Sequence, residues 1–338
     1  MGLAIGIGNG ILFTSQRGVS SIIPGLIDDL CARATYCENK LCTTATLEEI
    51  EAVRYTPPPP PPPPGLLLED YPGAAAAYSL RNLIDTTKNV VRVRRSSDNT
   101  EQNFSAAEIT DGTLTTFTGA NDGFVTTWYD QSGNNQDVSQ ATADQQPQVV
   151  SNGVVVLNNG KPSCIFNLDY LDSSNFITPN LSVGHTHFMV FEHISQLGNQ
   201  FDADAIFCIG IKGSSANSTR LSQLAMSGDT GSPIDYGFAT QGVTNSISVS
   251  FTSGQKLMTG LSKDSDCELF FNTLSQGTST NASVSPTVTP FFIRFGNVNW
   301  TTQVACNAHI TEFILYNTDQ SANRTAIETN INSHYTIY

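Results

Sequence analysis

Short runs in which apolar and polar residues alternate fill the chain from about residue 90 to residue 316, separated by Gly, Asn, Asp and Ser. Alternation with a period of two is typical of β-strands that bury one face, and many such strands with frequent turns indicate a sandwich or a barrel. The pattern predicts a mainly β domain with strands at 90–93, 124–129, 149–157, 187–191, 205–211, 247–251, 269–272, 291–295 and 310–316.

Two helices are predicted to frame this region. The alanine-rich segment 74–85 precedes the strands, and the segment 319–334 follows them. Asp319 is the expected N-cap of the second helix, and Ile327 and Ile331 lie one turn apart on one of its faces.

The first 56 residues have a different texture. Strands are predicted at 3–7, 10–14 and 19–23, and a short helix begins at Thr46, where Glu49 completes a capping box. Such small elements cannot bury a core alone, so we expect them to gain order on a partner or among copies of themselves.

An uninterrupted run of prolines at 57–64 separates the two regions. Proline fixes φ and removes the backbone donor, so the run predicts a polyproline II rod of about 25 Å at ~3.1 Å per residue. The expected organisation is therefore an anchoring segment at 1–56, a spacer at 57–72 and a β-sandwich at 73–338.

Charged residues make up only 14% of the chain and the net charge is −14, so the expected surface is neutral-polar and mildly acidic. An acidic chain repels phosphate backbones, which argues against nucleic acid as a partner. The apolar start, residues 1–13, is interrupted by Gly and has no preceding basic residue, so neither ordinary export nor membrane insertion is expected. A virus particle, assembled inside a cell and later exposed outside it, reconciles these features.

The seven cysteines are an odd number and cannot all pair within one molecule. Three of them, Cys31, Cys37 and Cys42, form a cluster near the N-terminus, which we call the first cluster. It could contain a local disulfide, and a zinc site is a weaker interpretation because no CxxC pair occurs. The other four are scattered and are predicted to be buried thiols: Cys164, Cys208, Cys267 and Cys306.

Three stretches are more particular than composition explains: AAAAYSLRNL (74–83), VRVRRSSDNTEQNF (91–104) and GFVTTWYDQSGNNQDVSQATADQQPQVV (123–150). Together they resemble the start of the catalytic domain of the α-L-arabinofuranosidase B family. With the ending at 310–338 they resemble more closely the sandwich domains of bacteriophage virion proteins. Both resemblances imply a concanavalin A-like (LamG-type) jelly-roll sandwich.

Hydrolysis of the arabinofuranosidase kind requires two carboxyl groups about 5 Å apart. Where the resemblance places them, this chain has Ser222, Gln223 and Asn297, which cannot protonate a leaving group. We therefore predict no catalytic residue and no cofactor, with a glycosidase as the alternative. Other carboxylates in predicted loops could replace the missing catalytic acids, and we call them the replacement acids. They could instead bind Ca²⁺. These residues are Asp202, Asp204, Asp229, Asp235, Asp264 and Asp266.

The block WYDQSGNNQD allows two interpretations. In one it is a tight loop whose side chains cap backbone donors, with the two aromatic residues alternating between core and surface. In the other it is a sugar-binding edge with an exposed aromatic face and amides for hydroxyl groups. The candidate carbohydrate-binding residues are Trp128, Tyr129, Asp130, Asn134, Asn135 and Asp137.

Two smaller groups could suggest an anion or a metal site. Arg92 and Arg94 are predicted on one strand face with Arg95 opposite, and salt bridges account for them in an acidic chain. His185 and His187 also share a face, but two imidazoles without a third ligand do not define a metal site.

The sequence thus predicts a bacteriophage virion structural protein: a head fibre, a decoration protein or a tail-associated protein. Residues 1–56 would contact other virion proteins, the chain would form a homo-oligomer, and the sandwich would face outward to bind host surface glycans or neighbouring subunits. The alternatives are an arabinofuranosidase-like hydrolase and a bacterial surface adhesin.

Overall fold

A computed structural model describes residues 65–85, 88–175, 184–195, 204–210, 220–227, 235–240, 246–250, 252–263, 266–280, 291–297 and 306–338. The chain divides into the units Met1–Pro62 and Pro63–Tyr338, and all described residues belong to the second. The predicted N-terminal strands and helix, the first cysteine cluster and the proline rod lie outside the described residues. Among the described helices, none is long and apolar enough to span a membrane.

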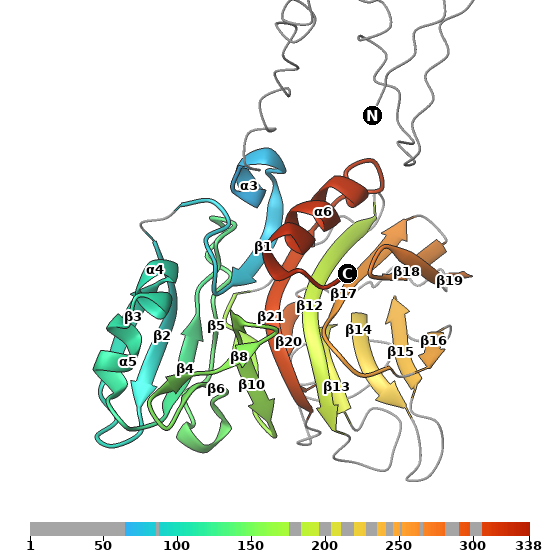
Figure 1. The fold of residues 1–338 in the computed structure, drawn as a ribbon. Helices are drawn as coiled ribbons and strands as arrows, with labels where there is room; N and C mark the ends of the chain where they lie inside the picture. Colours follow the sequence, from blue (N-terminus) through green and yellow to red (C-terminus); the bar gives the residue numbers. More distant parts are fainter. Residues whose placement is uncertain are drawn as a thin grey trace, which may run out of the picture. The chain divides into compact units, whose positions relative to one another are not determined.

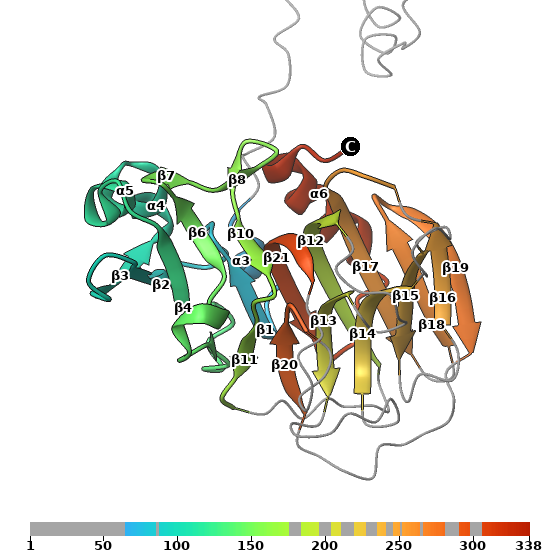
Figure 2. The same cartoon turned by 90° about the horizontal axis from the view of Figure 1, so that it is seen from below.

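Hydrogen bonds join 19 of the described strands into one continuous sheet, which folds over into two layers (Figures 1 and 2). We call the first layer the front sheet. Its strands, in pairing order, are β3 (Glu101–Ser105), β2 (Asn89–Arg95), β4 (Gly123–Trp128), β5 (Val138–Ser139), β11 (Leu171–Ser173), β20 (Phe292–Phe295), β13 (Asp204–Gly210), β14 (Arg220–Ser227), β15 (Asp235–Thr240) and β16 (Ser246–Ser250).

The second layer, the back sheet, is connected to the first by the pairing of β4 with β6. Its central strand β21 pairs with β12 along one edge and with both β1 and β10 along the other. In order, the back sheet contains β7 (Val154–Val155), β6 (Gln148–Ser151), β10 (Cys164–Asn167) with β1 (Ala74–Ser79), β21 (Asn307–Tyr316), β12 (His185–Ser195), β17 (Lys256–Lys263), β18 (Asp266–Phe271) and β19 (Leu274–Thr280).

Aromatic side chains fill the space between the sheets. Phe207 and Phe295 of the front sheet each contact Phe313 of the back sheet, with ring centroids 5.2 Å apart. Tyr78 and Trp128 complete this cluster and are fully buried. Every pairing among the described strands is antiparallel, so the predicted β-sandwich is confirmed.

A second core lies on the other side of the back sheet, where α6 (Arg324–Tyr335) covers it (Figure 1). Ile327 and Ile331 are buried there, as predicted. Leu67 and Leu68 of α3 (Leu67–Asp70) belong to the same cluster, so the end of the predicted 57–72 spacer packs on the sandwich from Gly65 onward.

The small elements lie between the strands. The helices α4 (Ala106–Thr110) and α5 (Thr113–Thr118) follow β3, and Ser105 with Glu108 forms a capping box that begins α4. A 3₁₀ turn, η1 (Ala143–Gln145), precedes β6. The separate hairpin of β8 (Leu157–Asn158) and β9 (Lys161–Pro162) projects toward α6.

The helix predicted at 74–85 is wrong, because 74–79 forms strand β1. Its alanines favour helix in isolation, but this segment pairs with β21 and is covered on both faces. Ala76 and Tyr78 face the inter-sheet core, whereas Ala74 and Ala77 belong to the core beneath α6. A strand buried on both faces has an unbroken apolar sequence that periodicity cannot distinguish from a helix.

Two element boundaries also differ from prediction. The last helix begins after Asn323 rather than at Asp319, because the Asp319 carboxylate accepts the Ser321 amide in a preceding turn. The strand predicted at 149–157 is a hairpin, since Asn152 and Gly153 have φ of +48° and +78° and reverse the chain.

The scattered cysteines, Cys164, Cys208, Cys267 and Cys306, are all buried, as predicted. The predicted salt bridges of the arginine group are confirmed in part. Arg92 pairs with Glu101 and Arg95 with Asp98. Arg94 is buried and instead donates to amide oxygens and lies over the Phe124 ring.

Candidate functional site

The loop predicted to bind sugar begins with Trp128, which has no exposed surface. Its ring lies 6.0 Å from Tyr78 and 5.9 Å from Phe295, inside the core. Trp128 therefore cannot stack on a sugar, and the expected exposed aromatic face is wrong for this residue. It alternates with the half-buried Tyr129, whose hydroxyl donates to Asn103 at 2.8 Å.

Asp130 is the centre of the loop. Its carboxylate accepts the backbone amides of Ala77 at 2.8 Å, Ser132 at 2.9 Å and Gln136 at 3.0 Å. The Asp130 amide in turn donates to Asp137 at 2.8 Å. These bonds satisfy backbone groups of β1 and of the loop itself, which is the work of a structural turn.

Of the other candidates in the loop, Asn134 and Asp137 have structural roles and Asn135 lies on the surface. Asn134 donates to the carbonyl oxygen of Ala74 at 2.9 Å, and burial raises the pKa of Asp137. Asn135 is exposed and has φ of +55°. The described contacts thus favour the structural interpretation, and a sugar contact through Tyr129 and Asn135 stays a prediction.

Gln131 extends this loop to a buried ion pair. Its amide nitrogen donates to the carbonyl oxygens of Ser79 and Arg81, and its oxygen accepts the Leu83 amide at 2.8 Å. Arg81 then forms two parallel hydrogen bonds to Glu312 of β21, at 2.7 and 2.9 Å. We call Asp130, Gln131, Arg81 and Glu312 the clamp, because together they fix the end of β1.

Glu312 is 1% exposed and accepts further bonds from Ser79 at 2.8 Å and from Tyr335 of α6 at 3.0 Å. Burial alone would raise the pKa of Glu312, but the Arg81 guanidinium and the Ser79 hydroxyl hold it below its ordinary value. The carboxylate is therefore ionised and fully engaged, which makes it a structural group and not a proton donor.

The outer face of the front sheet carries a row of residues at matching register. Asp172 pairs with Arg294, Arg294 with Cys208, and Cys208 with Gln223. Leu171 and Phe295, one position away, belong to the inner core, so this row lies on the opposite face.

Arg294 forms an ion pair and a ring contact in this row. Its Nη2 donates to Oδ2 of Asp172 at 2.6 Å, and its Nε donates to the other carboxylate oxygen. The guanidinium carbon lies 4.4 Å from the centroid of the Tyr170 ring. The Asp172 carboxylate is thus neutralised by a planar bidentate partner.

The positions expected to hold the catalytic acids lie beside this row. Ser222 of β14 is fully buried and its hydroxyl has no hydrogen-bond partner among the described residues, while Asn297 follows β20 and is 2% exposed. Gln223 lies within the row itself. The three positions therefore lie on the two strands that flank β13 in the front sheet, and none is ionisable.

Gly296 holds the turn that leads to Asn297. It has φ of +78°, and a Cβ there would overlap the carbonyl oxygen of Asp169 and the Phe166 ring. Gly133 has a similar φ of +88° but nothing lies within 4 Å of its would-be Cβ.

We expect Gly296→Ala to lower the free energy of unfolding by clearly more than Gly133→Ala, for which left-handed backbone strain of about 1–2 kcal/mol is the main cost. Urea denaturation of the two variants measures the difference. Equal losses would show that the backbone around Asp169 yields and that the turn does not constrain Asn297.

The replacement acids do not form a catalytic group among the described residues. Asp204, Asp235 and Asp266 begin β13, β15 and β18, so their predicted place in loops is wrong. Asp202, Asp229 and Asp264 lie outside the described residues. No cluster of three or more His, Cys, Asp or Glu side chains in the described ranges could hold a metal ion, and Ca²⁺ stays a prediction.

His185 and His187 share a face, as predicted, and their rings stack 6.1 Å apart between the sheets. Both are fully buried, and neither His185 ring nitrogen has a hydrogen-bond partner among the residues that the structure describes. Burial lowers the pKa of His185 to about 4, so it is neutral at physiological pH.

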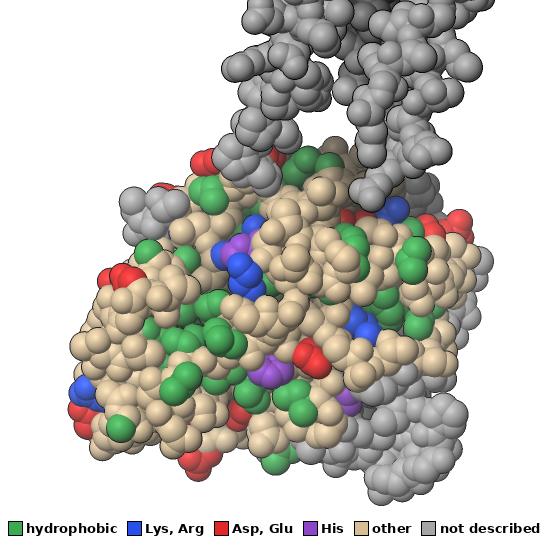
Figure 3. Space-filling view, viewed as in Figure 1, with side chains coloured by type: hydrophobic (Ala, Val, Ile, Leu, Met, Phe, Trp, Pro, Cys, Tyr) green, Lys and Arg blue, Asp and Glu red, His purple; other side chains and the backbone are tan. Residues whose placement is uncertain are grey.

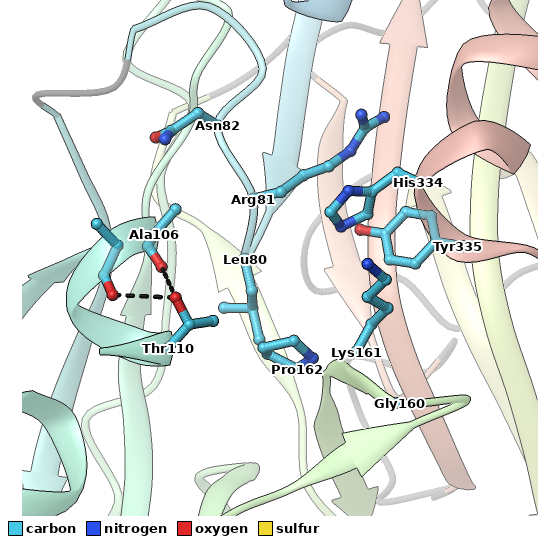
Figure 4. A pocket seen from close by; sticks show the side chains of 11 residues that line it. Leu80, Arg81, Asn82, Ala106, Thr110, Gly160, Lys161, Pro162, His334 and Tyr335 are labelled. Carbon is cyan, nitrogen blue, oxygen red and sulfur yellow. Dashed lines mark hydrogen bonds between the residues drawn. The ribbon is translucent and has the colours of Figure 1, made fainter. Parts of the chain in front are cut away.

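Sequence reasoning did not find the cleft beside α6, which has a volume of about 410 Å³. It lies between the segment after β1, helix α4, the β8–β9 hairpin and the end of α6. Figure 4 shows Lys161 of the hairpin reaching toward His334 and Tyr335, with Leu80 and Pro162 between these side chains and Thr110. The residues come from four distant stretches of sequence, and no local pattern connects them.

No protein-family model matches the chain, and neither does any curated protein sequence. Among solved structures it is similar to an arabinofuranosidase in complex with arabinofuranosyl-α-1,2-xylobiose, with a TM-score of 0.60 and 13% identity. A glutamate-to-glutamine mutant of GH54 α-L-arabinofuranosidase soaked with 4-nitrophenyl α-L-arabinofuranoside gives 0.59 and 13%.

Each of these alignments covers 78% of this chain and 64% of the arabinofuranosidase chain. This chain therefore contains a β-sandwich domain with the fold found in those arabinofuranosidases. At this identity the likeness extends to the fold alone.

Proposed function

We propose that the chain is a bacteriophage surface protein whose sandwich binds host glycans without hydrolysing them. The observation that carries the proposal is the row on the outer face of the front sheet. In a fold shared with sugar-hydrolysing enzymes, its one described carboxylate, Asp172, is held by Arg294, and the expected acid positions are Ser222, Gln223 and Asn297. A pair of carboxyl groups is required for hydrolysis but not for binding.

The setting on a virion is supported by the sequence. The three blocks and the C-terminal stretch resemble phage sandwich domains, and the chain divides into its two units within the proline run at 57–64. Charged residues make up only 14% of the chain, and charged side chains are sparse on the face shown in Figure 3. Such a surface suits weak contacts with hydroxyl-rich ligands, and repeated copies would let these contacts sum.

The test uses the full-length protein on an array of bacterial surface glycans, together with an assay for arabinofuranoside hydrolysis. We expect glycan binding that strengthens when copies are clustered, and no turnover. Absence of binding to every glycan, or turnover that depends on one carboxyl group, would overturn the proposal. Cryo-EM of particles, compared with particles made from a chain lacking residues 1–56, tests the anchoring role separately.

One observation favours a hydrolase as the second candidate. Burial raises the pKa of Asp169 to about 6, which is the range of a general acid, and Asp169 lies beside Gly296 and near Asp172 in sequence. If the chain is a glycosidase, Asp169→Asn should lower kcat by at least about a hundredfold. The exposed Asp144→Asn is the matched control and should leave kcat unchanged.

A further inference from the structure

The cleft beside α6 has the composition of a binding site for a small polar ligand. Its volume of about 410 Å³ falls within the roughly 300–1,000 Å³ of small-molecule sites. Leu80, Ala106 and Pro162 give it an apolar wall, and Lys161 and His334 give it a polar side (Figure 4). Basic and histidine side chains also lie together on the face shown in Figure 3.

The charge in this cleft is positive and is carried by Lys161. None of the eleven lining residues is acidic, and Lys161 has no ion-pair partner in the described part of the chain. The second cation, Arg81, is neutralised by its two bonds to Glu312. Lys161 is therefore a cation next to an apolar wall with no internal counter-charge, a setting that favours an anionic group.

A neutral polar group accompanies this cation. Burial, and then Arg81, lower the pKa of His334 to about 4, so its imidazole is neutral and can both donate and accept. The ring lines the cleft on the same side as Lys161, where it can hydrogen-bond a ligand hydroxyl (Figure 4).

We propose that this cleft binds an acidic sugar, that is, one sugar ring carrying a carboxylate or a phosphate. Lys161 pairs with the anionic group, the His334 imidazole hydrogen-bonds a sugar hydroxyl, and the ring packs on Leu80 and Pro162. A neutral sugar leaves Lys161 unpaired, and a bare anion leaves the apolar wall and His334 unused. The inference rests on the proposed function, because it names the kind of glycan unit that the displayed domain recognises.

The experiment is a calorimetric titration of the full-length protein with glucuronate, glucose-6-phosphate, glucose, acetate and inorganic phosphate. We expect one or both acidic sugars to bind at least about tenfold more tightly than glucose, since one charge-assisted hydrogen bond is worth that much or more. Acetate and phosphate should bind more weakly than the corresponding sugars. The two acidic sugars distinguish a carboxylate ligand from a phosphate ligand.

Lys161→Gln should reduce the affinity for the acidic sugar by about tenfold or more, whereas Lys88→Gln, which changes an exposed lysine elsewhere, should not. Asn82→Asp adds a negative charge to the cleft and should abolish acidic-sugar binding while the unfolding temperature shows that the fold persists. Affinities for glucuronate and glucose-6-phosphate that both equal the affinity for glucose, or an unchanged affinity in Lys161→Gln, would overturn the inference. If the protein binds glycans on the array but neither acidic sugar, the assignment of this cleft is wrong and the proposed function stands. If it binds no glycan on the array, both the proposed function and this assignment are wrong.

Discussion

Replacing Glu312 with glutamine is expected to lower the free energy of unfolding by about 3–5 kcal/mol. The change leaves the guanidinium of Arg81, which is 15% exposed, without its bidentate partner. It also weakens the acceptor for Ser79 and Tyr335, so the contacts of β1, β21 and α6 are lost together. Urea denaturation followed by tryptophan fluorescence measures the loss, since Trp128 lies in the adjoining core.

The matched control is Glu101→Gln, which removes the exposed partner of Arg92. These two side chains are 34% and 44% exposed, and an exposed pair contributes at most about 1 kcal/mol. A second control replaces Arg81 and Glu312 together with leucines, which should cost less than Glu312→Gln because no charge is left buried. Similar losses for Glu312→Gln and Glu101→Gln would show that the clamp does not hold the sandwich together.

A second large effect is expected on lowering the pH. His185 has an ordinary pKa of 6.5 and a folded-state pKa of about 4, because it is fully buried. No residue in the described ranges forms a hydrogen bond with its ring nitrogens. A lowered pKa means that the unfolded state binds the proton more tightly. The stabilisation is therefore complete above about pH 6.5 and is lost as the pH falls toward 4, by about 3 kcal/mol at ~1.4 kcal/mol per pKa unit.

His185→Phe should remove this part of the pH dependence, because phenylalanine fills the same space between the sheets and cannot be protonated. The measurement is the free energy of unfolding at about pH 7.5 and about pH 4.5 for both proteins. Phe188→Leu, a buried change on the same strand without a titratable group, should shift both values equally. If the free energy of unfolding of His185→Phe falls between the two pH values as much as that of the unchanged protein, another group causes the acid sensitivity. His187 is an example, because burial and His185 also lower its pKa.

The strand pattern was sufficient to predict the sandwich, because alternation is a local property of the sequence. It could not predict β1, where five of the six residues are buried and the alternation disappears. The clamp could not be predicted from the sequence either, because Arg81 and Glu312 are 231 positions apart and neither is unusual in its local context. Two of the three blocks that resemble known sandwich domains, 74–83 and 123–150, meet the C-terminal stretch in this clamp, so they indicated the fold and not an activity.

The candidate site was harder to predict than the fold, for a physical reason. Asp and Asn side chains that bind sugar hydroxyls and those that bind their own backbone occur in the same Gly-rich loops. Asp130 and Asn134 proved to be of the second kind, and Trp128 faces the core. The cleft, by contrast, depends on Arg81, Lys161 and His334, which only the folded chain brings together.

The position of β21 has a consequence for how the protein is made. This strand is the last of the sheet to be synthesised, yet it is the central strand of the back sheet and pairs with β1, β10 and β12. Until β21 is synthesised, these three strands lack their common partner, and their unpaired backbone groups can pair with other chains. The back sheet should therefore be completed only after β21 has left the ribosome, slowly because its contacts are distant in sequence, and chains that end before β21 should need chaperones to avoid aggregation.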